Sequence, residues 1–194
     1  SCNEIDRHLA VEAPVALEYN GVTHAVMMAT PDHLEEFAVG FSLCEGFIDA
    51  PGELREVFIS EAEQGWILRI TLDANLARPL LDRVRMRVSE GGCGLCGVES
   101  IEQALRPLPQ VRMKFHAGRD AICRVLGELP MQQQMGRLTG AMHAAAFCTP
   151  EGAIVRAMED LGRHNALDKL IGSLAIDAID PAGGFILVSA RCSY

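Results

Sequence analysis

The first third of the chain alternates apolar and polar positions in short runs that are separated by turn residues. Residues 11–29 contain two such runs around Asn20-Gly21, a dipeptide that strongly favours a two-residue hairpin turn. Residues 54–60 and 65–72 have the same character and predict a second pair of strands.

Between these strand pairs, apolar residues recur at helical spacing. The predicted apolar face consists of Leu34, Phe37, Ala38, Phe41 and Cys44. We expect Thr30 to cap this helix and Pro31 to occupy its first position, because threonine is a common N-cap residue and proline is common at the first position of a helix. Gly46 would end it.

The second half of the chain predicts a mixed α/β unit. Residues 118–138 are expected to be largely helical with an interruption near Pro130, and residues 142–148 and 153–158 to form a hairpin. A helix is predicted to begin at 162–165, with a core face of Leu167, Leu170, Ile171 and Leu174. Residues 183–190 predict a buried strand. Because this apolar strand lies so near Tyr194, we expect a further C-terminal segment.

Composition narrows the class of protein. The 194 residues are 49% hydrophobic with a net charge of -9 and a pI near 5.1, which disfavours a nucleic-acid binder. No apolar run approaches a membrane span, and the first residues do not show the charged region followed by an apolar region that is typical of a signal peptide. We therefore expect a cytoplasmic protein. The seven cysteines are irregularly spaced, which favours reduced thiols, and Cys44 and Cys148 are expected to be buried apolar residues.

The central segment SEGGCGLCGVES, residues 89–100, contains the C-x-x-C pair Cys93 and Cys96 among four glycines. It follows a strand-like run, residues 83–88, whose three arginines share one face. That face is either solvated or attracts an anionic acceptor.

Three interpretations of the cysteine pair remain open. Structural zinc needs four ligands, and this segment supplies one pair, which His116 and His143 would complete only through the fold. A thiol–disulfide oxidoreductase prefers a rigid pair at a helix N-terminus, whereas glycines favour a mobile loop. A sulfur carrier needs such an exposed, mobile thiol that accepts sulfur from a donor's persulfide.

A second candidate site is LGRHN, residues 161–165, at a predicted helix start. Helix N-termini bind anions, Arg163 is suited to phosphate and His164 to proton transfer. The alternative is that Asn165 caps the helix while Arg163 and His164 are solvated. His143 lies in an apolar strand and is either a hydrogen-bonded core residue or a ligand-binding one.

Several segments together resemble the FdhD/NarQ family of formate dehydrogenase accessory sulfurtransferases. They are EAPVALEYNG at 12–21, MMATPDHLEEFAVGFSLCEGFI at 27–48, CGLCG at 93–97, TGAMHAAA at 139–146, EDLGRHNALDKLIG at 159–172 and VSARCS at 188–193. They span nearly the whole chain. One departure is Ala190, where the family usually has glycine.

The resemblance implies a sulfurtransferase that takes sulfur from a cysteine desulfurase and passes it to the molybdenum bis(molybdopterin guanine dinucleotide) cofactor of formate dehydrogenase. Cys93 would carry the persulfide and Cys96 would assist. We place the cofactor near Arg163, His164, Asn165 and His143, with a guanine nucleotide as a mimic and with no structural metal. A cofactor-binding chaperone without essential sulfur transfer is the alternative.

The resemblance also implies a homodimer and an α/β fold: a cytidine deaminase-like α/β/α sandwich with a smaller N-terminal α+β part. Pro107 and Pro109 mark a linker, so we expect an N-terminal part over 1–108 and a deaminase-like core over 109–194. Deamination itself is not expected, because His143-Ala144-Ala145 lacks the glutamate of the H-x-E motif.

Overall fold

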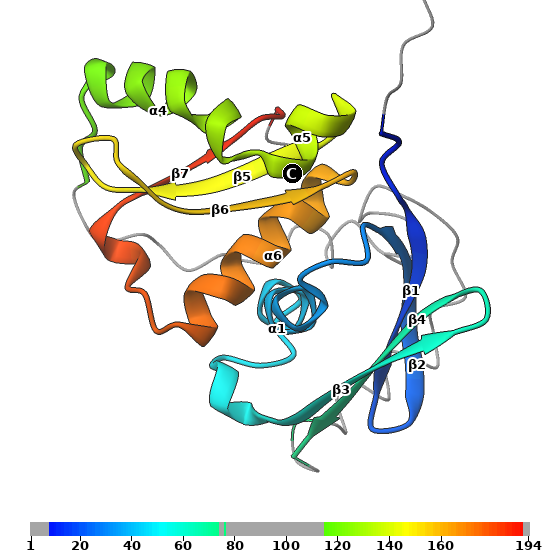
Figure 1. The fold of residues 1–194 in the computed structure, drawn as a ribbon. Coiled ribbons are helices and arrows are strands. Elements are labelled where there is room, and N and C mark those ends of the chain that lie inside the picture. Colours follow the sequence, from blue (N-terminus) through cyan, green and yellow to red (C-terminus); the bar gives the residue numbers. More distant parts are fainter. Residues whose placement is uncertain (1–7, 74–75, 77–114, 192–194) are drawn as a thin grey trace, which may run out of the picture.

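The computed structural model describes residues 8–73, 76 and 115–191. Within these residues the chain is a mixed α/β protein with two separate sheets. Helices α1 and α6 lie between the sheets, and α4 and α5 cover the outer face of the C-terminal sheet (Figure 1).

The N-terminal sheet has four strands in the order β2-β1-β4-β3, and only the β1–β4 pair is parallel. The strands are β1 (Ala13–Tyr19), β2 (Val22–Ala29), β3 (Leu54–Ala62) and β4 (Gly65–Leu72). The predicted hairpin turn is confirmed: Asn20 and Gly21 both have positive φ, as a type I′ turn requires. Alternate residues of β1, namely Val15, Leu17 and Tyr19, are fully buried under α1.

Helix α1 (Leu34–Cys44) has the predicted apolar face, but its predicted start was wrong. Its N-cap is His33, in the left-handed conformation, and Thr30 makes no cap. The physical reason is that the Thr30 hydroxyl instead accepts a hydrogen bond from the Leu161 N–H, 131 residues further along the chain.

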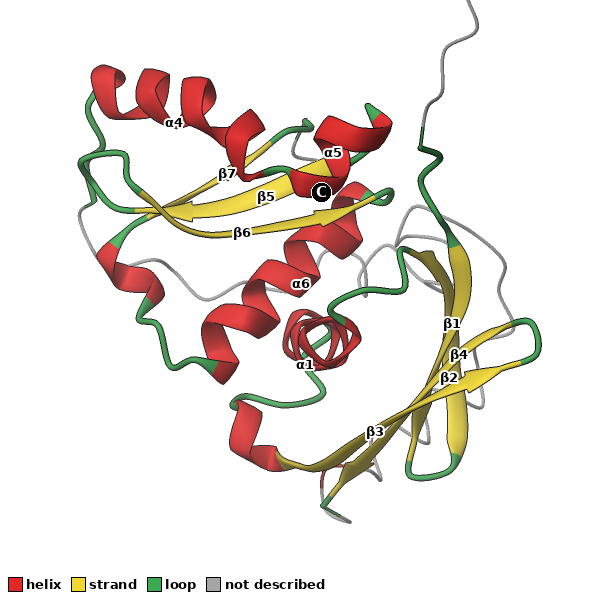
Figure 2. Ribbon diagram, viewed as in Figure 1, coloured by secondary structure: helices red, strands yellow, loops and turns green. Residues whose placement is uncertain are grey.

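The C-terminal sheet has three antiparallel strands in the order β6-β5-β7. They are β5 (His143–Cys148), β6 (Ile154–Asp160) and β7 (Phe185–Val188), which confirms the predicted hairpin. Helix α6 (Arg163–Ile176) packs on one face, and α4 (Arg119–Gln132) packs on the other (Figure 2). Short 3-10 helices span Pro51–Glu53 and Pro181–Gly183.

Two details of this part differ from the sequence prediction. Pro130 lies inside α4, and the break before α5 (Gln134–Thr139) falls at Gln133. The strand predicted over 183–190 is only four residues long, and it lies at the edge of the sheet with Ile186 44% exposed. Cys148 is fully buried as expected, whereas Cys44 is only partly buried.

The two sheets are joined by the packing of α1 against α6. At the crossing, a Cβ on Gly40 would overlap the carbonyl oxygen of Asp168, and a Cβ on Gly172 would overlap that of Glu36. Glycine at both positions therefore allows the two backbones to touch. This contact fixes α1, and the N-terminal sheet that packs on it, against the middle of α6.

The proposed boundary at residue 108 lies outside the described residues and stays a prediction. Among the described helices, none has both the length and the apolar character that a bilayer crossing requires.

Candidate functional site

Three of the segments singled out in the sequence meet at one end of the C-terminal sheet. Strand β5 begins there with His143, which pairs with Asp160 at the end of β6. Strand β7 ends at the same place, where the Ser189 N–H donates to the carbonyl of Ala144. The antiparallel order thus brings 139–143, 161–164 and 188–191 together, although His143 and Ser189, which meet there, are 46 positions apart in sequence.

Arg163 and His164 form the first turn of α6 at this end of the sheet. The N-cap is Gly162, in an extended conformation and with no side-chain cap, so the idea that Asn165 caps the helix is wrong. Burial, and secondly the charge of Arg163, lower the pKa of His164. Its imidazole is therefore neutral at neutral pH and can both donate and accept a hydrogen bond.

Arg163 is half-buried, and its Nε atom has no hydrogen-bond partner among the described residues. A buried donor of this kind costs free energy unless something accepts from it. Together with the positive end of the α6 helix dipole, it makes this turn suited to an anion.

His143 is half-buried at the first position of β5 rather than a core residue. Its Nδ1 lies 3.4 Å from the hydroxyl of Ser189, and that hydroxyl accepts a hydrogen bond of 2.8 Å from the Ala144 N–H. The serine thus fixes the end of β7 beside the imidazole. His143 is consequently placed where the three segments meet.

Asn165 is buried and its side-chain amide is engaged inside the protein. Its Nδ2 donates to the carbonyl of Met28 at 2.8 Å and to Asp160 at 3.1 Å. The amide thus connects α6 to the end of β2. The predicted contact of Asn165 with the cofactor stays a prediction.

Sequence reasoning missed the residues that hold this turn in place. Lys169 and Asp160 are fully buried and form an ion pair of 2.7 Å. Lys169 also donates to the Thr30 carbonyl at 2.9 Å, and the Thr30 N–H donates to Asp160 at 3.0 Å. One feature of the sequence could have indicated the buried ion pair: Lys169 lies beside Leu170, a residue of the predicted apolar face of the helix.

Cys93 and Cys96, and the three arginines of residues 83–88, lie outside the described residues. The choice among zinc, redox and carrier interpretations therefore does not follow from the geometry. Among the described residues, no group of three or more His, Cys, Asp or Glu side chains could hold a metal ion.

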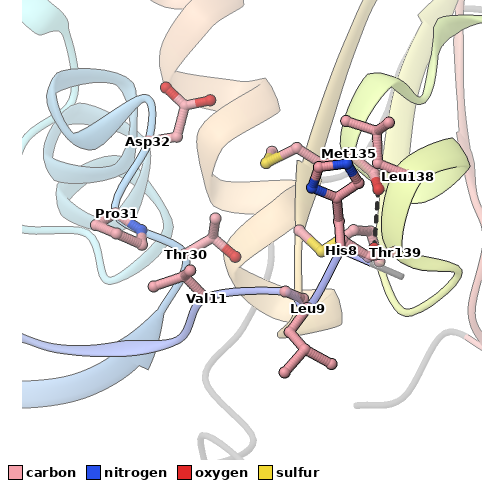
Figure 3. A pocket seen from close by; sticks show the side chains of 11 residues that line it. His8, Leu9, Val11, Thr30, Pro31, Asp32, Met135, Leu138 and Thr139 are labelled. Atoms are coloured by element: carbon pink, nitrogen blue, oxygen red, sulfur yellow. Dashed lines mark hydrogen bonds between the residues drawn. The ribbon is translucent and has the colours of Figure 1, made fainter. Parts of the chain in front are cut away.

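A cavity of about 270 Å³ lies where the N-terminal residues approach α5 (Figure 3). Its lining is mostly apolar and includes Leu9, Val11, Pro31, Met135 and Leu138. Thr30 and Thr139 also line it, so it adjoins the meeting point of the three segments. Of the predicted site residues that the structure describes, namely His143, Arg163, His164 and Asn165, none lines this cavity.

A family model described as the FdhD/NarQ family matches residues 10–194. The chain belongs to the FdhD/NarQ family. The matched range covers nearly the whole chain, and it includes the C-x-x-C pair as well as the three segments that meet at the end of the C-terminal sheet.

Among the FdhD/NarQ relatives, this chain is 42% identical to a sulfur carrier protein FdhD of Bordetella petrii over 186 residues. It is 46% identical to one of Xanthomonas campestris pv. campestris over 186 residues. Both matches cover 96% of this chain but only 67% and 66% of the relatives. The chain therefore spans about two thirds of their length.

A crystal structure described as a formate dehydrogenase accessory protein from Desulfotalea psychrophila has the same fold, with a TM-score of 0.66. The match covers 97% of this chain and 67% of that one at 23% identity. This likeness supports the mixed α/β architecture of the FdhD/NarQ chain.

Proposed function

We propose that this protein is a sulfur carrier in the maturation of formate dehydrogenase. In the proposed relay a cysteine desulfurase donates sulfur, and the molybdenum bis(molybdopterin guanine dinucleotide) cofactor accepts it. The observation that carries the proposal is identity of 42–46% to sulfur carrier proteins over 96% of the chain. The convergence of His143, Arg163 and His164 supports an anion-binding acceptor side.

The proposed loading step is a thiol exchange at Cys93. The Cys93 thiolate attacks the outer sulfur of the desulfurase persulfide, the sulfur–sulfur bond of that persulfide breaks, and the desulfurase thiolate leaves. Cys93 then holds a persulfide, and no net oxidation has occurred.

The proposed release step uses Cys96. Its thiolate attacks the inner sulfur of the Cys93 persulfide, a Cys93–Cys96 disulfide forms, and the outer sulfur leaves as sulfide for the acceptor. The dithiol supplies the two electrons that reduce this sulfur. A cellular dithiol reductant would then restore the cysteine pair.

The proposed acceptor site is the meeting point of 139–143, 161–164 and 188–191. Arg163, with a buried Nε that lacks a partner among the described residues, would bind a phosphate of the cofactor together with the N-terminus of α6. His164, neutral because burial and Arg163 lower its pKa, would donate or accept a hydrogen bond there. His143 and Asn165 complete the proposed contacts.

We further propose that the protein acts in the cytoplasm as a homodimer and that its C-terminal part is a cytidine deaminase-like sandwich. The support for the latter is that helices α4 and α6 cover opposite faces of the C-terminal sheet. His143 would then stand near the place of the deaminase H-x-E motif without its glutamate.

A comparison of a Cys93→Ala/Cys96→Ala double variant with wild type tests this function against its alternatives. We expect guanosine diphosphate, used as a probe, to bind both proteins, and sulfur from cysteine and a desulfurase to label only wild type. Reduction of insulin disulfides by wild type would favour the oxidoreductase. Normal maturation of formate dehydrogenase by the double variant would favour the chaperone.

A further inference from the structure

The last two residues of β6, Glu159 and Asp160, are both buried carboxylates, at 7% and 0% exposure. Neighbouring residues of a strand point to opposite faces of its sheet. The two side chains accordingly reach different helices, and of the proposed acceptor site His143 lies on the chain between those helices while Arg163 and His164 open the second one.

Glu159 points to the face covered by α4 and α5. Its two oxygens accept hydrogen bonds from the N–H groups of Met135 and Gly136, at 2.9 and 2.7 Å. A Cβ on Gly136 would lie 2.9 Å from the Glu159 oxygen, so glycine there permits this close approach. Glu159 thereby fixes the start of the segment that leads through Thr139 to His143.

Asp160 points to the face covered by α6. One oxygen accepts from the Gly162 N–H at 2.7 Å, and the other accepts from Thr30 N–H and Lys169. The bond to Gly162 fixes the backbone immediately before Arg163. Asp160 thereby sets the direction in which α6 begins.

Burial of a carboxylate is expensive, and well-packed apolar residues would often stabilise a protein as well or better. Glu159 forms no salt bridge among the described residues; its partners there are two backbone N–H groups. Its contribution therefore lies in fixing geometry rather than in a favourable charge pair. Glu159 accepts from backbone N–H groups at the start of α5, before His143, and one Asp160 oxygen accepts from the backbone N–H just before Arg163.

We propose that Glu159 and Asp160 are positioning residues that hold the two sides of the acceptor site, 135–143 and 161–164, at a fixed separation. This inference rests on the proposed function, because it assigns the acceptor to that place. The new element is that the affinity for the acceptor depends on Glu159 and Asp160, although neither side chain contacts the acceptor.

The test measures guanosine diphosphate affinity by calorimetry and persulfide loading by intact mass, well below the melting temperature of each variant. The first variant is Glu159→Gln, which keeps the side-chain length but has one oxygen acceptor fewer. The second is the double variant Asp160→Asn/Lys169→Met, which removes both charges of the buried ion pair at once. The matched control is Glu53→Gln, since Glu53 also accepts from a backbone N–H, that of Asp49, but in the N-terminal part. Arg163→Ala serves as the reference for direct loss of a contact.

We expect both positioning variants to lose affinity by about tenfold or more, the loss that removal of an outer partner typically causes at metal sites. Persulfide loading should stay at the wild-type level, and Glu53→Gln should change neither quantity. A merely structural role would lower both readouts in proportion to the folded fraction.

Two results would overturn different parts of the account. Wild-type affinity in Glu159→Gln, with Arg163→Ala weakened, would overturn the positioning role and leave the proposed function intact. No binding of the nucleotide by wild type would overturn the proposed acceptor site, and this inference with it. If the double variant does not fold, Glu159→Gln alone decides the result.

Discussion

Lys169 and Asp160 form an ion pair of 2.7 Å in which neither side chain is accessible to solvent. The pair joins α6 to the end of β6, and both residues also bind Thr30 from the N-terminal part. Two segments 130 residues apart are thus held at the start of α6 by one buried charge pair.

We predict that Lys169→Met destabilises the protein by about 3–5 kcal/mol, because it leaves the Asp160 carboxylate buried without its cation. Asp160→Asn added to this variant should recover part of the loss, since it removes the unpaired charge. Urea unfolding of the wild type, both single variants and the double variant measures the coupling. Equal or greater loss in the double variant would contradict the assignment of the ion pair.

The crossing of α1 and α6 gives a second prediction. Gly40→Ala and Gly172→Ala should each lower the free energy of unfolding by about 1–3 kcal/mol or more, because the new methyl group overlaps a backbone carbonyl. Gly127→Ala in α4 is the matched control, as its Cβ would meet nothing within 4 Å. There alanine should stabilise by roughly 0.5–1 kcal/mol through its helix preference. A neutral effect at Gly40 would exclude the close crossing.

Asp168 gives a prediction for pH dependence. Burial, opposed by a hydrogen bond from Cys44, raises the pKa of this carboxyl to about 7. The folded protein therefore holds this proton more tightly than the unfolded chain does. The contribution of Asp168 to the free energy of unfolding is thus greatest below about pH 4 and is lost as the pH rises towards 7. Glu45 and Asp160 act in the same direction as burial.

Asp168→Asn should remove this loss. We expect the free energy of unfolding of the variant to change less between pH 5 and pH 8 than that of wild type, as measured by urea titration at both values. An identical pH dependence in the two proteins would show that Asp168 titrates normally.

The charge of Arg163 lowers the pKa of His164, in addition to burial. Arg163→Ala should therefore raise the His164 pKa part of the way towards its ordinary value of about 6.5. Nuclear magnetic resonance titration of the imidazole measures this directly. Arg55→Ala in β3, a strand of the N-terminal sheet (Figure 1), is the control and should leave the His164 pKa unchanged.

Much of the fold follows from local signals in the sequence. Asn20-Gly21 predicts the first hairpin because glycine and asparagine accept positive φ, and the apolar spacing from Leu34 to Phe41 predicts the buried face of α1. The start of α1 was predicted wrongly because the residues before it bind a distant part of the chain. Local capping preference carries no information about such a partner.

In the candidate site, too, local sequence signals predict some of the residues but not their long-range contacts. The sequence identifies Arg163, His164 and His143 as candidates, and the structure places them at one end of a sheet. The sequence alone does not reveal that Asp160 binds both Asn165 and Lys169, or that this group binds the end of β2. These hydrogen bonds form only once the two parts of the protein pack together. The place of Cys93 and Cys96 relative to this site stays a prediction.

The most direct test of the sulfur-carrier function is intact-mass spectrometry after incubation with a cysteine desulfurase, cysteine and pyridoxal phosphate. Wild type should gain the mass of about one sulfur atom, Cys96→Ala should retain this gain, and Cys93→Ala should lose it. The absence of any added sulfur on wild type, or a gain that persists in Cys93→Ala, would contradict the assignment of Cys93 as the carrier.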